Sequence, residues 1–324
     1  MHWANYGEDN VYWGNIIGES RNMRTRPLGA FRNNKAHTSD WQGFRFHHFE
    51  QFFRYRNEVD VPIFENMMAY RNREHGIYAH NVIAAEWRGG KLVDNQYGIV
   101  IKIADRLTVS DYDIIGATET FKNHIANRPR KFCDASVPAY RMDSDGNWVR
   151  PWAGNWAWLR HLQGLTMSNF MHRLGESDPW RGLKMNNVTI SGYGDEELAW
   201  YPTCAESDPI TIDLLEKNDG HFNYISTFTN VKIDGDKIMN GCRASETVGV
   251  SDLVINDADG SMDPTGTATN GALVQDYEHV TGILPNCNSI GNCMAYCSGV
   301  CLRTMSFKVE QHGTADWKLR VSFV

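Results

Sequence analysis

Two histidines and the arginines near them are the residues of this chain best suited to acid–base or anion-binding chemistry. His37 and His75 each flank a predicted turn, and Arg45, Arg71 and Arg73 lie close to them in the sequence. Histidine changes charge near neutral pH, and arginine binds carboxylates through a planar fork of donors. We therefore take His37, His75 and Arg71 as candidate catalytic residues. The alternative is that both histidines hydrogen-bond the backbone of turns and serve only the fold.

Basic and aromatic side chains provide candidate contacts to a sugar polymer. Aromatic rings can bind the apolar face of a pyranose, and arginines can bind its carboxylates. Trp152 and Trp156 come from a segment that also holds Trp148 and Trp158. The packing of a long loop is the alternative explanation of these tryptophans. The candidate substrate-binding residues are Arg45, Arg73, Tyr78, Arg88, Trp152 and Trp156.

Acidic side chains around Gly260 form a candidate calcium site. Calcium takes six to eight oxygen ligands, and oxygen-bearing side chains alternate along this segment. The distal Glu of the twelve-residue helix-loop-helix motif does not follow them, which excludes that motif. Ordinary Asp-Gly turns explain the same pattern. The candidate ligands are Asn256, Asp257, Asp259 and Asp263.

The seven cysteines favour disulfides and a location outside the cytosol. Four of them fall within fifteen residues, at spacings that do not form the paired C-x-x-C knuckles of a zinc site. An Asn-Val-Thr sequence at Asn187 is an acceptor for N-glycosylation, in agreement with an extracellular or cell-surface location. The disulfide candidates are Cys287, Cys293, Cys297 and Cys301.

The elements that must position these residues are short strands in a repeating chain. Ala36 and Ala69 each precede a glycine and a new apolar run by seven residues and Leu92 does so by six, and Gly76 and Gly98 are 22 residues apart. A repeat of about 20 to 25 residues is typical of one coil of a solenoid. The sequence therefore predicts an all-β protein built from parallel strands.

In such a solenoid, equivalent residues of successive coils lie about 4.8 Å apart. We expect His37, Tyr70 and Val93 to form one file, and Arg45 and Tyr78 to form another. Turn asparagines in successive coils are expected to satisfy backbone groups as a ladder. The predicted members of that ladder are Asn34, Asn72 and Asn95.

The predicted β-helix covers residues 1–303, with an irregular insertion at about 127–181. Regular coils are expected to resume at Leu183, and residues 304–324 alternate like strands that begin a following β-domain, such as a β-sandwich. Met1 to Asn10 lack the basic start and apolar core of a secretory signal. We expect the chain to be part of a longer polypeptide with further domains.

Charge is divided unevenly along the chain, whose formal net charge is -7. Residues 21–91 hold 12 Lys or Arg against 7 Asp or Glu, whereas residues 181–324 hold 10 against 19. A locally basic face can attract a polyanion in an acidic protein, because screening confines such fields to about 10 Å. A solvated surface of mixed charge is the alternative.

Several function classes are excluded by missing motifs. The sequence holds no phosphate-binding G-x-x-x-x-G-K-[ST], no dinucleotide fingerprint after a strand, no H-E-x-x-H and no serine nucleophile elbow. No apolar stretch approaches the ~20 residues that cross a bilayer. We expect no nucleic-acid partner, no cofactor other than calcium, and a monomer.

Ordered motifs resemble one family. They are Pro27 to His37, Ala69 to Gly76, Asp94-Asn95 with Gly98-Ile99, Asp234 to Lys237, Asp257 to Ser261, and Cys297 to Cys301. In this order they resemble the vertebrate cell-surface hyaluronidase and the cell migration-inducing, hyaluronan-binding protein. The resemblance implies a right-handed parallel β-helix of the pectate-lyase-like kind, secreted or displayed on a membrane, that acts on or binds hyaluronan and requires calcium. The glycine-rich domain that precedes the helix in this family has no counterpart here.

The sequence is compatible with three functions. The first is an extracellular β-helix that binds a glycosaminoglycan such as hyaluronan and takes part in its cleavage. The second is a self-contained polysaccharide lyase or glycoside hydrolase, which needs a base and a carboxylate-neutralising group on one face. The third is a non-catalytic, adhesive scaffold that spaces other domains.

Overall fold

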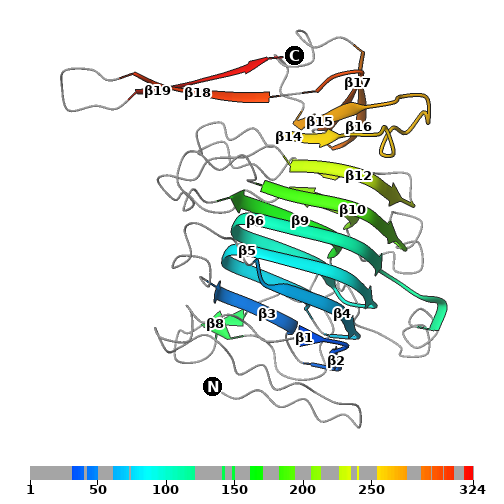
Figure 1. Cartoon of the computed structure of the whole chain (residues 1–324). Helices are drawn as coiled ribbons and strands as arrows, with labels where there is room; N and C mark the ends of the chain where they lie inside the picture. Colours follow the sequence, from blue (N-terminus) through cyan, green and yellow to red (C-terminus); the bar gives the residue numbers. More distant parts are fainter. Residues whose placement is uncertain are drawn as a thin grey trace.

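The computed structural model of the chain is all-β over the residues that it describes, and most of its strands form one, mostly parallel sheet (Figure 1). This confirms the predicted fold class at that level. Within the described part of the chain, no helix is long and apolar enough to cross a membrane. The described residues are 31–39, 42–49, 61–72, 74–120, 141–142, 148–149, 161–170, 182–193, 206–212, 226–234, 239–240, 254–275, 286–292, 294–301, 303–309 and 317–323.

Two long strands organise the sheet, because each of them takes part in two rows of parallel neighbours. These strands are β5 (His75–Val93) and β6 (Tyr97–Ile115), which pair in parallel along nearly their whole length. Their first halves belong to what we call the first row, with β3 (Gln42–Phe49), β9 (His161–Phe170), β11 (Glu206–Ile212) and β13 (Met239–Asn240). Their second halves belong to the second row, with β1 (Phe31–Arg32), β2 (Lys35–His37), β4 (Ile63–Tyr70), β10 (Gly182–Ser191), β12 (Ser226–Ile233) and β14 (Val254–Asp257).

The parallel arrangement ends at an antiparallel cap. Strand β15 (Gly271–Gln275) runs against β14, and β17 (Met294–Ser298) joins β15 to β16 (Cys287–Asn292). Because β16 also pairs with β13, the cap connects the ends of the two rows. Two separate antiparallel pairs are β7 (Arg141–Met142) with β8 (Trp148–Val149) and β18 (Arg303–Val309) with β19 (Trp317–Phe323). The second of these is the predicted C-terminal strand pair.

The strand register confirms the predicted alignment of the repeats but shows that their lengths differ. Ala36 pairs with Ala69, and Ala69 with Leu92, as predicted. The step is 22 residues from Ile77 to Ile99, but Phe44 lies 33 residues before Ile77. The strands therefore repeat while the connections between them vary. Parallel pairing also resumes earlier than predicted, because β9 begins at His161, inside the segment 127–181 expected to be an insertion.

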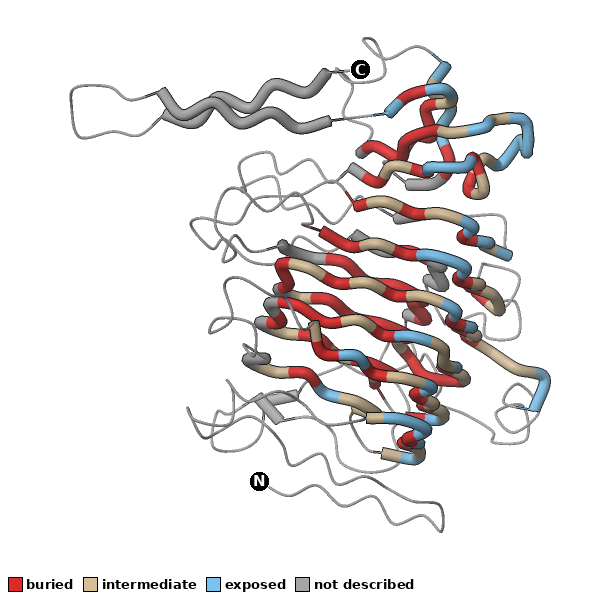
Figure 2. Tube along the Cα trace, viewed as in Figure 1, coloured by how far each residue is buried: buried red, intermediate tan, exposed pale blue. Residues whose placement is uncertain are grey.

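Both rows bury their inner side chains in one hydrophobic core, visible as the buried band along the strands in Figure 2. Alternate residues of a strand face opposite sides, so Ile77 and Ala79 of β5 point inward in the first row. Trp87 of the same strand is fully buried in the second row and belongs to the same core. Burial of each large apolar side chain contributes about 1.5–3 kcal/mol. Because the rows share a core, their outer surfaces face in different directions.

Glycines are required where successive repeats approach each other most closely. A Cβ atom on Gly43 would lie 2.8 Å from the carbonyl oxygen of Gly76, and one on Gly76 would lie 2.8 Å from that of Gly98. Real Cβ atoms essentially never come so close to backbone. The glycine that marked each repeat in the sequence is therefore a packing requirement of adjacent strands.

A ladder of amide side chains supports the turn that follows the second row. The Oδ1 atom of Asn95 accepts hydrogen bonds from the backbone N–H and the Nδ2 of Asn72, both at 3.0 Å. The Oδ1 of Asn72 in turn accepts the N–H of Ser39 at 3.1 Å. The predicted place of Asn34 in this ladder was wrong, because Asn34 precedes β2 while the ladder position follows it. Ser39 occupies the position in that repeat.

A second column of polar residues, which we call the outer column, follows a bend in the second row. Its Asn and Asp members have positive φ angles, which these residues tolerate better than other non-glycine residues. The Nδ2 of Asn187 donates to Asp111 at 2.6 Å, and Asn230 donates to Asn187 at 2.9 Å. The column comprises Asn33, Asn66, Gly89, Asp111, Asn187 and Asn230. The predicted glycosylation acceptor, Asn187, is thus an exposed member of a hydrogen-bonded column.

Candidate functional site

Aromatic and histidine side chains gather on the outer side of the first row. In β5, Tyr78 and His80 alternate with the buried Ile77 and Ala79, so they point away from the core and are partly exposed. The parallel register brings His47 of β3 beside His80. His75 and Tyr97, at the beginnings of β5 and β6, join this group through ring contacts, although only 12% of the His75 side chain is exposed. We call the group the histidine–tyrosine face, and it comprises His47, His75, Tyr78, His80 and Tyr97.

The rings of this face are in direct contact. His75 stacks on Tyr97 of the next repeat, with 5.0 Å between ring centroids and 22° between planes. It also contacts Tyr78 at 5.0 Å, and Tyr78 lies 6.2 Å from His80. His47 and His80 are 4.8 Å apart. The result is a continuous set of rings across β3, β5 and β6.

Arg45 provides a positive charge beside these rings. It is exposed in β3, and its register partner in β5 is Tyr78, as the sequence predicted. A guanidinium next to aromatic rings can bind the carboxylate of a sugar whose apolar side lies on the rings. Arg45 and Tyr78 are therefore two predicted binding residues that the structure brings together.

His75 also has a carboxylate partner. Its Nδ1 lies 3.5 Å from Oε2 of Glu74, and only 12% and 8% of the two side chains are exposed. When His75 is protonated, this contact is an ion pair in surroundings with little water. A histidine next to a buried carboxylate can hold and release a proton, which is the chemistry required of an acid–base residue.

The other two candidate catalytic residues lie at the corner between the rows. His37 stacks on Tyr70, with centroids 4.7 Å apart and planes 12° apart, and its Nδ1 is 3.2 Å from the Thr38 hydroxyl. The predicted file of His37, Tyr70 and Val93 is confirmed by the register. His37 and His75 thus contact different tyrosines.

Arg71 at this corner is held by a buried carboxylate. Its Nε lies 3.8 Å from Oδ2 of Asp94, whose side chain is only 4% exposed. Burial raises the pKa of Asp94, while hydrogen bonds from the backbone and hydroxyl of Thr118 and the charge of Arg71 act in the opposite direction. This geometry gives Arg71 a role in holding the turn.

Among the remaining predicted binding residues, the structure describes only Arg88. Arg88 is in the second row, where it forms an ion pair with Glu86 two residues away. Arg73, Trp152 and Trp156 lie outside the described residues. Of the predicted catalytic and binding residues that the structure describes, His75 and Tyr78 belong to the histidine–tyrosine face, and Arg45 lies beside them.

The acidic side chains predicted to bind calcium accept hydrogen bonds from backbone N–H groups and from a tyrosine hydroxyl. Asp257 is buried and accepts from the Tyr296 hydroxyl at 2.9 Å and the Met262 N–H at 3.0 Å. Asp259 accepts the N–H of Asn230 at 2.7 Å, and Asp263 accepts that of Ala268 at 2.7 Å. Asn256 is in β14 beside Asp257. Across the ranges described here, no group of three or more His, Cys, Asp or Glu is arranged to hold a metal ion.

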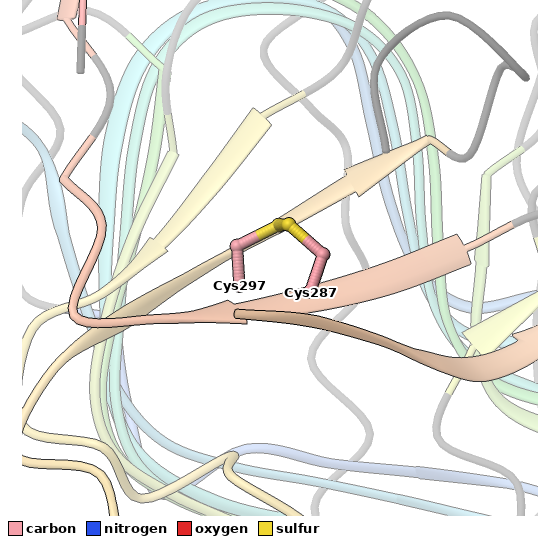
Figure 3. The surroundings of a disulfide bond; sticks show 2 residues. All are labelled: Cys287 and Cys297. Atoms are coloured by element: carbon pink, nitrogen blue, oxygen red, sulfur yellow. A yellow bond between two sulfur atoms is a disulfide. The ribbon is translucent and has the colours of Figure 1, made fainter. Parts of the chain in front are cut away.

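One of the predicted disulfide cysteines is paired with another in the cap. Cys287 of β16 is bonded to Cys297, which lies opposite it in β17 (Figure 3). Cys301 is exposed and has a free thiol, and Cys293 lies outside the described residues.

Sequence reasoning missed His47, His80 and Tyr97 as members of a common face. The sequence does indicate that His47 and His80 pair, because they are 33 residues apart, the same distance that separates Gly43 from Gly76. Applying the glycine alignment to all residues of the repeat would have paired the two histidines.

Comparison of the sequence with models of known protein families and with curated proteins gives no match. The family resemblance drawn from the ordered motifs therefore remains a prediction.

Proposed function

We propose that this chain is a glycan-binding, right-handed parallel β-helix from an extracellular, hyaluronidase-like protein. Its ligand in this proposal is an anionic polysaccharide such as hyaluronan. The two parallel rows around one core, in register from repeat to repeat, support a solenoid. The Cys287–Cys297 disulfide is compatible with an oxidising compartment. Other domains of a longer chain, a monomeric state and calcium at Asp257, Asp259 and Asp263 remain predictions.

The single observation that carries the proposal is the histidine–tyrosine face with Arg45 beside it. A polysaccharide has alternating apolar and polar surfaces, so it binds best where rings and hydrogen-bonding groups lie next to each other. Tyr78, His75 and His80 provide the rings, and Arg45 provides a cation.

Ion pairs in the second row make the broader basic segment less suitable for this ligand. The Nε atom of Arg32 lies 2.5 Å from Oε2 of Glu65, and Nζ of Lys91 lies 4.0 Å from Oδ2 of Asp113. Arg88 is paired with Glu86. These contacts pair three of the basic side chains of residues 21–91 with carboxylates, and of these carboxylates only Asp113 lies outside that segment. The proposed binding surface is the first row around Arg45, because the rings of the histidine–tyrosine face lie there.

A comparison of two arginines tests this proposal. Because Arg45 is beside the rings and Arg88 is in the other row, we expect Arg45→Ala to weaken binding of fluorescent hyaluronan about three- to tenfold. Arg88→Ala is the matched control and should change the affinity less than twofold. Binding is measured by fluorescence anisotropy at several salt concentrations, since an ionic contact weakens as salt is raised. Absence of wild-type binding at low salt, or an equal loss in both variants, would contradict the proposal.

Depolymerisation is a second function, favoured by the contact between His75 and Glu74. The pair can move a proton at the edge of the proposed binding face. Incubation with hyaluronan and with galacturonate polymers, followed by size analysis and ultraviolet absorbance, distinguishes hydrolase, lyase and inactive binder. His75→Gln should abolish any cleavage while keeping most of the binding. Cleavage that persists in His75→Gln would place the reaction elsewhere.

A further inference from the structure

Two histidines of the histidine–tyrosine face lie side by side on adjacent strands. His47 in β3 and His80 in β5 are register partners in the first row, on the outer side of the sheet. Both are partly exposed, so solvent and ions can reach them. Imidazole is a common ligand of zinc, copper and nickel ions.

From this pair we infer a binding site for a divalent late transition metal, with Cu²⁺ or Zn²⁺ as the occupant. Metal–imidazole bonds are about 2.0–2.1 Å long, so two imidazoles side by side on one ion have ring centroids about 4.5–5.2 Å apart. The centroids of His47 and His80 are 4.8 Å apart. The strand register alone therefore places the two rings at the separation that a shared ion requires.

The inclination of the rings is also suitable. Their planes differ by 48°, whereas His37 and Tyr70 stack nearly in parallel at 12°. Inclined rings can direct nitrogen atoms toward a common point, while face-to-face stacking directs ring faces at each other.

The site has two protein ligands, and water fills the other coordination positions. No third His, Cys, Asp or Glu completes a metal-holding group among the described residues. A two-histidine site is weaker than a structural zinc site with four ligands, and it leaves positions open for an exchangeable ligand. By the usual order of divalent ions, Cu²⁺ is the tightest occupant. The inference does not depend on the proposed polysaccharide binding.

Copper titration of single and double variants tests the site in the full-length chain. The chain has 12 histidines, so the informative quantity is the difference from wild type. We expect His47→Gln and His80→Gln each to lower the affinity of the tightest Cu²⁺ site at least about tenfold. Because both rings bind one ion, the double variant should be hardly weaker than either single variant. Electron paramagnetic resonance should show two coordinated nitrogens in wild type and fewer in each variant.

His37→Gln is the matched control, since His37 is also partly exposed but stacks on a tyrosine. His37→Gln should leave the affinity of the tightest Cu²⁺ site unchanged. Arg45→Ala should also leave it unchanged, because Arg45 belongs to the proposed polysaccharide site and not to the metal site. Wild-type affinity in both His47→Gln and His80→Gln, or strictly additive losses, would overturn the inference.

A measurement without substitutions covers the case in which a variant does not fold. Diethyl pyrocarbonate modifies accessible imidazoles, and peptide mass analysis shows which ones react. Cu²⁺ or Zn²⁺ should protect His47 and His80 together but not His37. Equal modification of the pair with and without the ion would exclude a shared site.

Discussion

Local hydrogen bonds lower the pKa of the Asp263 carboxyl in this protein. Burial by itself raises the pKa of Asp263, but bonds from the Thr265 hydroxyl and from the N–H groups of Thr265, Ala268 and Thr267 outweigh burial and lower it to about 2. The carboxylate is thus more easily ionised in the folded chain than in the unfolded chain, where its pKa is near 3.8. The stability that it contributes is present above about pH 4 and is lost as the pH falls toward 2.

Replacing Asp263 with Asn should therefore flatten the acid side of the stability profile. Between pH 4 and pH 2 the variant should lose less stability than wild type, because one carboxylate no longer has to be protonated on unfolding. Chemical denaturation at a series of pH values measures the effect. Asp234→Asn, at an exposed carboxylate, is the control. Identical acid slopes in wild type and Asp263→Asn would contradict this account.

The candidate site could be predicted only in part from single residues. Tyr78 and Arg45 were found because they follow repeated glycines by the same number of residues. Glu74 was not found, since a carboxylate that faces a neighbouring histidine looks the same in a sequence as one that faces water. Arg71 was predicted to bind or catalyse, yet its contact with Asp94 comes from a residue 23 positions later.

At the scale of elements, turn ladders hold the strands in register. Asn95 satisfies two donors of Asn72 through its Oδ1 and donates from Nδ2 to the carbonyl of Ala69 at 2.9 Å. Both asparagines are buried, so water cannot replace these bonds. The repeat pattern predicted which strands align, but it could not predict connection lengths, because loop closure depends only weakly on loop length.

Asn95→Ala should lower the free energy of unfolding by about 2–4 kcal/mol, because buried donors and an acceptor are left unsatisfied. Urea denaturation followed by circular dichroism measures this loss. Asn186→Ala, at an exposed position of β10, is the matched control and should cost less than ~0.5 kcal/mol. A loss at Asn95 no larger than that at Asn186 would show that the ladder contributes little to stability.

At the scale of the whole molecule, the cap protects one end of the parallel rows. An uncovered strand edge pairs readily with another chain, and antiparallel β15 and β17 occupy the edge that β14 would otherwise expose. Asp257 and Tyr296 join the cap to the last repeat through a buried hydrogen bond. The clustered cysteines indicated disulfides in this region, but their pairing could not be read from spacing alone, since several connectivities fit.

Loss of the Cys287–Cys297 disulfide should destabilise this cap. Replacing both cysteines with serine should cost about 2–3 kcal/mol, the effect expected for a loop of this size. The expected result is a lower melting temperature and more aggregation in wild type with reductant and in the double variant. Cys301→Ser alters only the free thiol and should behave like wild type. Equal stability of oxidised and reduced wild type would contradict the prediction.

The 22-residue step between β5 and β6 makes that part of the chain a natural unit for lengthening the protein. Duplicating residues 75–96 would add one strand to each row and would keep Gly76 and Asn95 opposite their counterparts. In a duplication of any other length, the extra or missing residues would have to be accommodated in a surface connection. The protein can therefore grow by whole modules without a new core design, and each added module would extend the outer surface by one strand spacing, about 4.8 Å.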